Sequence, residues 1–278
     1  MKCAWKAYIN LLPHWMRDDV DRLGREALLE LRLRIGQPPQ LQLTSGSVWL
    51  TQLITHDDLI YCVNVASKYS PWSVSSINRG YITAPGGHRI GICGSCVVKK
   101  GTLTGIGCVS SVCIRVSRDF VGCANGAEYL GRSILVLGRP GSGKTTFMRD
   151  LIRFRADNEP TTVIDEKFEL FPICDQNFCF YSGKQTDVLS GISKQAGIEI
   201  AIRNMGPRTI AVDEITAQED CEALIHAGWC GVSLFATAHA ENLDDLERRI
   251  IYRPLVECGL FDTYIIMQPD KSWRQERR

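Results

Sequence analysis

The chain has 278 residues, of which 45% are hydrophobic and 23% charged, a composition typical of a soluble globular protein of one or two domains. The formal net charge of +1 excludes a strong overall field that would recruit nucleic acid or an anionic membrane. No stretch approaches the roughly 20 apolar residues that span a bilayer, and the N-terminal residues lack the apolar block of a signal peptide. We therefore expect no transmembrane span.

Residues 1–130 carry 14 Lys and Arg against 9 Asp and Glu, a charge of +5, and their pattern predicts an α+β unit. Apolar residues recur at helical spacing over residues 18–35, which predicts one helix, and the acids at 57 and 58 open a second that runs to residue 69. Between them, residues 41–50 fit two short strands around a turn, and residues 81–116 are strand-like with many glycines.

Residues 131–278 have a charge of −4 and alternate between two patterns. Apolar runs typical of buried strands lie at 134–137, 162–164, 209–212 and 233–236, and helical patterns fall between several of them. This alternation predicts an α/β fold whose parallel sheet is covered on both faces. A stretch with Ala-Asn-Gly at 122–132 is the expected linker, so we expect two domains, residues 1–125 and 126–278.

A phosphate-binding motif follows the first of these runs. Residues 138–145 match G-x-x-x-x-G-K-[ST] between a predicted strand and a predicted helix. Glycines let the backbone wrap closely around phosphates, and the helix N-terminus adds partial positive charge. Lys144 is expected to reach the β- and γ-phosphates and Thr145 to bind Mg²⁺. The alternative is a Gly-rich turn without a ligand. The candidate nucleotide contacts are Gly138, Arg139, Pro140, Gly141, Ser142, Gly143, Lys144, Thr145 and Thr146.

Two apolar runs end in paired acids. Asp213 and Glu214 follow one, and we expect Asp213 to hold Mg²⁺ through water and Glu214 to polarise the attacking water. Asp165 and Glu166 follow the other, and either carboxylate could act as general base. The alternative for both pairs is a solvated acidic turn at the end of a strand.

A third run ends in Thr237 and His239, which could sense the γ-phosphate through hydrogen bonds. A histidine after a strand also serves in packing alone, so spacing leaves both roles open. Spacing likewise assigns Thr146 and Arg149 to the helix surface rather than to catalysis.

Short motifs along nearly the whole chain match one family pattern. They lie at residues 31–34, 80–83, 86–91, 114–116, 140–146, 149–153, 186–189, 202–203, 205 and 212–215. The Gly-Gly-His-Arg run at 86–89 and the Thr-Asp-Val-Leu run at 186–189 are the most specific together. On these residues the chain resembles the stage III sporulation protein AA family, the ATPase of a sporulation channel complex in endospore-forming bacteria. That family is in turn similar to type II and type IV secretion ATPases.

This resemblance implies a RecA-like P-loop ATPase core behind a smaller N-terminal domain that serves ring and partner contacts. It implies ATP and Mg²⁺ as cofactors, a homo-oligomeric ring of six subunits, and membrane proteins of a sporulation channel as partners. It places the protein in the cytoplasm, peripheral at the membrane of the mother cell. Asp165 and Glu166 match the acidic box of secretion ATPases, and residues 237–240 resemble their histidine box.

The chain departs from the family pattern at two arginines. Lys167 stands after the acid pair where the family has Arg, and Gln185 precedes the Thr-Asp-Val-Leu run where the family has Arg. Nucleotide binding is therefore better supported than hydrolysis. Arg203 or Arg115 could supply positive charge to a neighbouring subunit's site. Each could equally be an ordinary ion-pair residue.

Three functions follow in order of preference. The first is an ATP-driven ring motor that energises assembly of, or transport through, a membrane complex. The second is a scaffold that binds ATP and oligomerises with little hydrolysis. The third is a nucleic-acid motor, but no run of Lys and Arg supports it, so we expect no specific nucleic-acid partner.

The 12 cysteines leave one further alternative. Cys93 and Cys96 form a C-x-x-C motif, and Cys108 and Cys113 follow, so a zinc site is conceivable. The second pair has the wider spacing and no histidine joins it, which favours small buried residues on Gly-rich strands.

Overall fold

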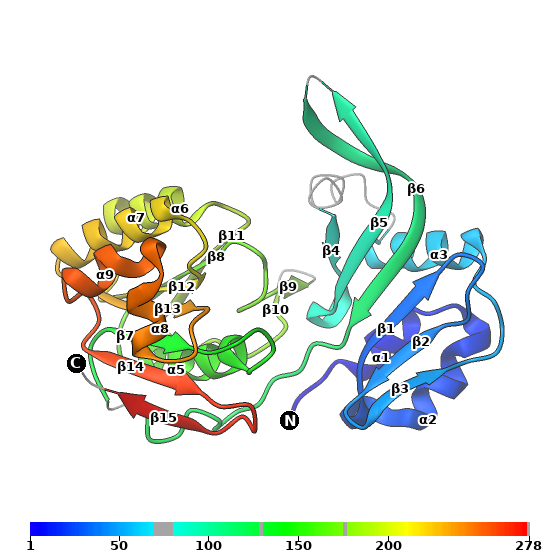
Figure 1. The fold of residues 1–278 in the computed structure, drawn as a ribbon, viewed down its shortest axis with the longest axis horizontal. Coiled ribbons are helices and arrows are strands. Elements are labelled where there is room, and N and C mark those ends of the chain that lie inside the picture. Colours follow the sequence, from blue (N-terminus) through cyan, green and yellow to red (C-terminus); the bar gives the residue numbers. More distant parts are fainter. Residues whose placement is uncertain (69–79, 100, 128–129, 175–176, 277–278) are drawn as a thin grey trace. The chain divides into compact units, whose positions relative to one another are not determined.

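A computed structural model describes most of the chain, and Figure 1 shows its fold. The chain folds into two compact units. The first unit consists of Met1–Asp119 with Pro172–Cys179, and the second of Phe120–Phe171 with Phe180–Arg278. The return of residues 172–179 to the first unit was not foreseen, and the predicted division after residue 125 stays a prediction. The described residues are 1–68, 80–99, 101–127, 130–174 and 177–276.

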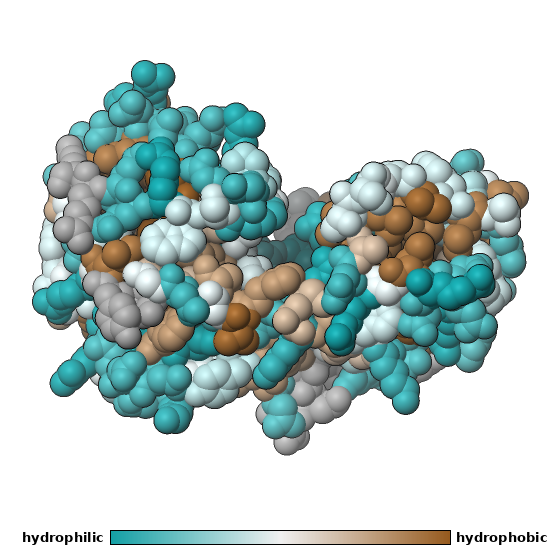
Figure 2. All heavy atoms as spheres, turned by 90° about the horizontal axis from the view of Figure 1, so that it is seen from below, coloured by the Kyte–Doolittle hydropathy of each residue, from teal (hydrophilic) through white to brown (hydrophobic). Residues whose placement is uncertain are grey.

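The first unit is built around a six-stranded antiparallel sheet in the order β3-β2-β1-β6-β5-β4. Short helices pack against this sheet. On the face of the unit that is visible in Figure 2, apolar side chains are exposed among polar ones. Its elements are α1 (Trp5–Asn10), η1 (His14–Met16), α2 (Arg17–Ala27), β1 (Leu28–Arg34), β2 (Gln40–Leu43), β3 (Gly46–Trp49), α3 (His56–Ala66), β4 (Tyr81–Thr83), η3 (Pro85–Gly87), β5 (Arg89–Lys99), β6 (Thr102–Arg115), β9 (Ile173–Cys174) and β10 (Asn177–Phe178).

The helix predicted over residues 18–35 is wrong in its second half. The helix ends at Ala27, after Gly24 adopts a left-handed φ of 77°, and Leu28–Arg34 forms the strand β1. Leu31 and Leu33 are wholly buried, and the polar residues between and after them are only partly buried, which is the period of a strand. Since β1 pairs with β2 on one side and β6 on the other, this alternation directs these two leucines into the core.

The second predicted helix and the strand predictions are confirmed within the described residues. Thr55 caps α3, because its hydroxyl accepts from Asp58 N while the Asp58 carboxylate accepts from Thr55 N at 2.9 Å. The helix ends at Ala66, and the predicted end at residue 69 lies outside the described residues. β2 and β3 pair around the predicted turn, and β4, β5 and β6 occupy residues 81–115.

The cysteines of the β5–β6 hairpin correct one expectation. Cys93, Cys96 and Cys108 are exposed rather than buried. Among the described residues, no group of three or more potential ligands is arranged to hold a metal ion. Small size on a Gly-rich strand therefore did not predict burial, because beyond Cys93 and Ser111 the described residues of β5 and β6 pair only with each other.

The second unit is built on a seven-stranded sheet in the order β11-β8-β12-β13-β7-β14-β15, parallel except for β15. All four predicted strands are present, so the predicted fold class is confirmed. One face of this sheet is covered by α6, α7, α8 and α9, whose apolar residues share one core, and α5 lies on the other face. This division is expected because the connections between parallel strands are right-handed crossovers. The elements are β7 (Ile134–Leu137), α5 (Lys144–Asn158), β8 (Thr161–Asp165), β11 (Thr186–Ser190), α6 (Lys194–Ile200), η4 (Ala201–Met205), β12 (Thr209–Glu214), α7 (Gln218–Trp229), β13 (Ser233–Ala238), α8 (Leu243–Arg248), η5 (Ile250–Tyr252), α9 (Arg253–Glu257), β14 (Thr263–Met267) and β15 (Trp273–Glu276).

Candidate functional site

The P-loop lies between β7 and α5, as the motif predicts. β7 ends at Leu137, and α5 begins at Lys144 after Gly143, whose φ of 98° suits glycine. Gly138 is required by close approach, because a Cβ there would lie 2.5 Å from Ser142 Oγ. The chain can therefore turn sharply enough to direct backbone N–H groups toward one point.

Lys144 closes this loop from within. Its side chain is buried, and Nζ donates to the carbonyl oxygens of Gly138 at 2.8 Å and Arg139 at 3.1 Å. Nζ also lies 2.9 Å from Nδ1 of His239. Burial lowers the pKa of Lys144 to about 8, and the charge of Glu214 opposes this shift. A phosphate that replaced the two carbonyl oxygens would favour the ammonium form further.

Lys144, His239 and Glu214 form a continuous chain of hydrogen bonds. Nε2 of His239 lies 2.5 Å from Oε1 of Glu214. In the tautomer with the ring proton on Nε2, Nδ1 accepts from the Lys144 ammonium and Nε2 donates to the carboxylate. The ends of β12 and β13 thus bring two predicted residues to the P-loop lysine. Thr237 is buried, and its carbonyl oxygen accepts from Ile215 N.

Asp213 lies in a buried cluster of charges that the sequence motifs did not reveal. Nζ of Lys194 lies 2.7 Å from Glu166 Oε2, 3.0 Å from Asp213 Oδ1 and 3.6 Å from Asp220 Oδ2. Burial raises the pKa of Asp213 to about 6, and Lys194 opposes this shift. Burial lowers the pKa of Lys194, but attraction by Asp213 and the other acids outweighs it and raises the pKa overall.

Asp165 holds its own loop in place. Its carboxylate accepts from the backbone N of Glu169 at 2.8 Å, Leu170 at 3.1 Å and Phe171 at 2.9 Å. Burial raises the pKa of Asp165, and these hydrogen bonds oppose the shift. A general-base role for Asp165 stays a prediction, but its carboxylate is already engaged.

Arg149 is not on the helix surface, so that prediction is wrong. It is 4% exposed, and it donates to the carbonyl oxygens of Leu170 at 2.7 Å and Glu169 at 2.9 Å. Its guanidinium also lies 4.3 Å from the centre of the Phe180 ring. Arg149 therefore ties the P-loop helix to the loop that follows β8. Thr146 is half-buried at the start of that helix.

The two candidate arginines lie on exposed surfaces. Arg203, on η4, pairs with Glu199 at 2.8 Å. Arg115, at the end of β6 in the first unit, lies 3.6 Å from Glu30. Among the described residues of the second unit, no ion pair joins Arg203 to an acid of the P-loop region. A role in a neighbouring subunit's site stays a prediction for both.

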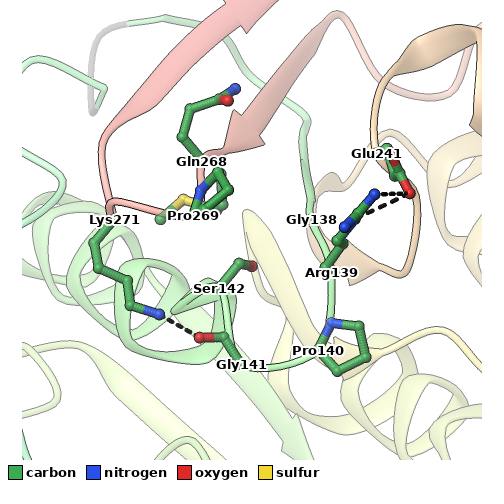
Figure 3. Close-up of a pocket in the computed structure, with 10 residues that line it drawn as sticks. Gly138, Arg139, Pro140, Gly141, Ser142, Glu241, Gln268, Pro269 and Lys271 are labelled. Atoms are coloured by element: carbon green, nitrogen blue, oxygen red, sulfur yellow. Dashed lines mark hydrogen bonds and ion pairs between the residues drawn. The ribbon is translucent and has the colours of Figure 1, made fainter. Parts of the chain in front are cut away.

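A pocket of about 490 Å³ opens beside the P-loop (Figure 3). One wall is the loop itself, where Arg139 pairs with Glu241 at 2.7 Å. The opposite wall is the turn after β14, with Met267, Pro269 and Lys271. Such a volume lies within the range of about 300–1,000 Å³ for small-molecule sites. No motif predicted this wall.

The residues present suit magnesium and a nucleotide polyphosphate. Asp213 Oδ2 is buried without a hydrogen-bond partner among the described residues, and the Thr145 side chain is partly accessible at the start of α5. Oxygen ligands of this kind are those that Mg²⁺ prefers. The glycine cradle, one buried ammonium and these oxygens together fit a Mg²⁺–nucleotide complex.

A P-loop after a central parallel strand, with acids at the ends of β12 and β8 in the same sheet, defines a RecA-like P-loop NTPase core. The X-ray structure of the Legionella pneumophila ATPase DotB is similar, with a TM-score of 0.59 and 14% identity over 96% of this chain and 80% of that one. The crystal structure of the pilus retraction motor PilT with bound ADP has a TM-score of 0.61 and 17% identity over 89% and 76% of the two chains. These likenesses confirm the fold.

The family follows from the sequence. Residues 10–275 match the family described as sporulation stage III, protein AA, and the chain belongs to it. Stage III sporulation protein AA of Bacillus subtilis (strain 168) is 31% identical over 278 residues, which cover 95% of this chain and 91% of that protein. The family resemblance inferred from the motifs is therefore confirmed. Within the described part of the chain, no helix has the length and apolar character needed to cross a membrane.

Proposed function

We propose that this protein binds Mg²⁺–ATP at the P-loop, hydrolyses it, and works as a hexameric ring that energises a sporulation membrane complex. The observation that carries the catalytic part is the Lys144–His239–Glu214 chain, because it joins the phosphate-binding lysine to a carboxylate through one histidine. The family supports the link to sporulation, and the RecA-like fold supports the ring. A cytoplasmic position at the mother-cell membrane belongs to the same proposal.

The proposed cycle begins with a change of partners for Lys144. Incoming β- and γ-phosphates replace the carbonyl oxygens of Gly138 and Arg139 as acceptors for Nζ. His239 loses its donor at Nδ1 when Lys144 moves, so it can turn a ring N–H toward the γ-phosphate. Bound Mg²⁺ would neutralise charge on the phosphates, and Thr145 with Asp213 would hold it.

Glu214 is the general base in this proposal. Release of His239 frees the Glu214 carboxylate to orient the attacking water. Glu166 is a weaker candidate, since its carboxylate pairs with Lys194 at 2.7 Å. Asp165 is weaker still, because three backbone N–H groups already bind it.

A scaffold that binds ATP with little turnover is the second candidate function. Two positions favour it, Lys167 and Gln185, because the chain lacks there the arginines of the family pattern. An arginine supplied in trans can accelerate phosphoryl transfer by about 10³–10⁵-fold. Turnover would then depend on ring assembly, which makes the oligomeric state part of the test.

The test measures Mg²⁺–ATP turnover and oligomeric mass on the same purified protein. Wild type is compared with Lys144→Ala and Glu214→Gln, with and without nucleotide. We expect a ring with slow turnover, loss of nucleotide binding in Lys144→Ala, and binding without turnover in Glu214→Gln. Turnover that persists in Lys144→Ala would refute the P-loop assignment. A monomer saturated with nucleotide would refute the ring motor, and an assembled wild type without turnover would favour the scaffold.

A further inference from the structure

The β5–β6 hairpin continues beyond the sheet of the first unit as a two-stranded arm (Figure 1). β4 pairs with β5 only over residues 89–91, and β1 pairs with β6 only over residues 111–115. We call residues 94–109 the arm, because as strands they pair only with each other in the described part of the chain. At roughly 3.3 Å per residue, the β5 side of the arm is about 20 Å long.

The base of the arm is anchored in the first unit. Val109 is buried, and Ile106 packs against the core. The two strands then approach closely, since a Cβ on Gly94 would meet the carbonyl oxygen of Cys108. The register also shifts three times within residues 93–98, and bulges of this kind twist a strand pair. Particular residues of the sequence therefore determine the path of the arm.

The outer part of the arm exposes apolar side chains. Val97 is 42% exposed and Val98 is 57% exposed. Because consecutive residues of a strand point to opposite faces, the two valines present apolar surface on both sides of the arm. Cys96 and Cys108 are exposed as well, and free cysteine behaves as a small apolar residue. A partner with one flat surface would cover only one side of such a tip, whereas an apolar medium covers both.

The charge around the arm has one sign. Residues 59–118 contain seven Lys and Arg and no Asp or Glu. Two of the seven are consecutive in the sequence at positions 99 and 100, and Lys99 is exposed at the end of β5, directly after the two valines. The net charge of +1 for the whole chain therefore hides a positive segment, and this segment is complementary to an anionic surface.

Apolar side chains next to a lysine fit an anionic lipid surface. The apolar groups can enter the boundary between headgroups and acyl chains while the ammonium group faces the lipid phosphates. A single-stranded nucleic acid fits less well, because residues 93–111 contain no aromatic side chain on which a base could stack.

We propose that the tip of this arm binds an anionic membrane surface, with Val97 and Val98 in the interface and Lys99 at the lipid phosphates. The inference goes beyond the proposed ATPase activity, because the arm belongs to the first unit and its binding to lipid needs no nucleotide. In the proposed ring, several arms would bind one membrane together, and such multivalent binding is stronger than that of a single arm.

The test measures binding of the full chain to vesicles by flotation, without nucleotide. One kind of vesicle contains phosphatidylglycerol and phosphatidylcholine in equal amounts, and the other contains phosphatidylcholine alone. We expect wild type to bind the anionic vesicles about tenfold more tightly. This difference should shrink as added salt screens the lysine from the phosphates.

Two variants separate the apolar contribution from the charge. Val97→Thr with Val98→Thr retains the β-branched shape of both side chains and should weaken binding to anionic vesicles about tenfold. Lys99→Gln removes one charge and should weaken binding to the anionic vesicles about fivefold, with no change on phosphatidylcholine. Circular dichroism checks that both variants are folded.

The chain offers a matched control for each variant. Val48→Thr with Val121→Thr alters two valines away from the arm that are 43% and 61% exposed, so it removes similar apolar surface. Lys184→Gln removes an exposed lysine of the second unit. Both controls should bind the anionic vesicles as wild type does.

The outcomes separate this inference from the proposed function. A wild type that does not bind anionic vesicles would overturn the arm proposal, and so would equal losses in the arm variants and their controls. Arm variants that lost duplex DNA binding or self-association, with vesicle binding unchanged, would overturn it in favour of another partner. ATP turnover is measured on the same preparation. Vesicle binding that depends on the arm, in a protein without nucleotide binding, would support the arm proposal while the proposed function failed.

Discussion

Nζ of Lys194 lies 3.0 Å from Oδ1 of Asp213, so the carboxylate expected to serve Mg²⁺ already faces a cation of the chain's own. Lys194 is wholly buried at the start of α6, and it also contacts Glu166 and Asp220. One lysine therefore compensates three carboxylates from three different elements. This arrangement holds the acids in place before any ligand arrives.

Removal of this lysine should be severely destabilising. Lys194→Met leaves the buried Asp213 carboxylate without its cation, which typically costs about 3–5 kcal/mol. Chemical denaturation at pH 7 measures the free energy of unfolding. Lys184→Met, at an exposed site, should change it by less than about 0.5 kcal/mol. A loss below about 1 kcal/mol in Lys194→Met would show that the cluster does not depend on its lysine.

Nucleotide binding should take up a proton at alkaline pH. Burial lowers the pKa of Lys144 from 10.5 to about 8, so the free site is mostly deprotonated at pH 9. Phosphates favour the ammonium, so binding at pH 9 should take up about 0.9 proton, and binding at pH 7 about 0.1. Calorimetry in buffers of different ionisation enthalpy counts these protons. Lys144→Arg stays charged throughout and should take up none at this site. Equal uptake at both pH values in wild type would contradict the assignment.

Two of the three candidate bases, Glu214 and Glu166, should differ sharply in their effect on turnover. Glu214→Gln should lower the rate by about 10²–10⁴-fold with nucleotide affinity retained, because the carboxylate that orients water is lost. Glu166→Gln should lower it less than about tenfold, since Glu166 mainly pairs with Lys194. Single-turnover ATP hydrolysis measures both. The reverse order would move the general base from β12 to the end of β8.

The sequence predicted those site residues that belong to motifs. Glu214 and His239 come to Lys144 because carboxyl ends of parallel strands meet at one edge of a sheet. Lys194 and Lys271 could not be predicted, since each enters the site through long-range packing that no local pattern records. The fold prediction failed at residues 28–34, where a helix was expected and a strand is present. The leucines of this segment fit both the apolar spacing of a helix and the alternation of a strand, so spacing alone could not distinguish them.

That strand can be tested through the alternation of its side chains. Leu31 and Leu33 are both wholly buried, whereas a helix would turn residues two apart to nearly opposite sides. Leu31→Ala and Leu33→Ala should therefore each cost about 2–5 kcal/mol of unfolding free energy, because each opens a cavity in the first unit's core. Chemical denaturation of the full chain, followed by fluorescence and circular dichroism, measures both losses.

A third leucine of the same strand supplies the matched control. The pairing of β1 with β2 shifts register between Leu28 and Glu30, and Leu29, which lies at this irregularity, is 39% exposed. Leu29→Ala should lower the free energy of unfolding by less than about 1 kcal/mol, because this partly exposed side chain buries little apolar surface in the core. A small loss at either Leu31 or Leu33, with a large loss at the other, would contradict the strand, because a helical face buries only one of the two.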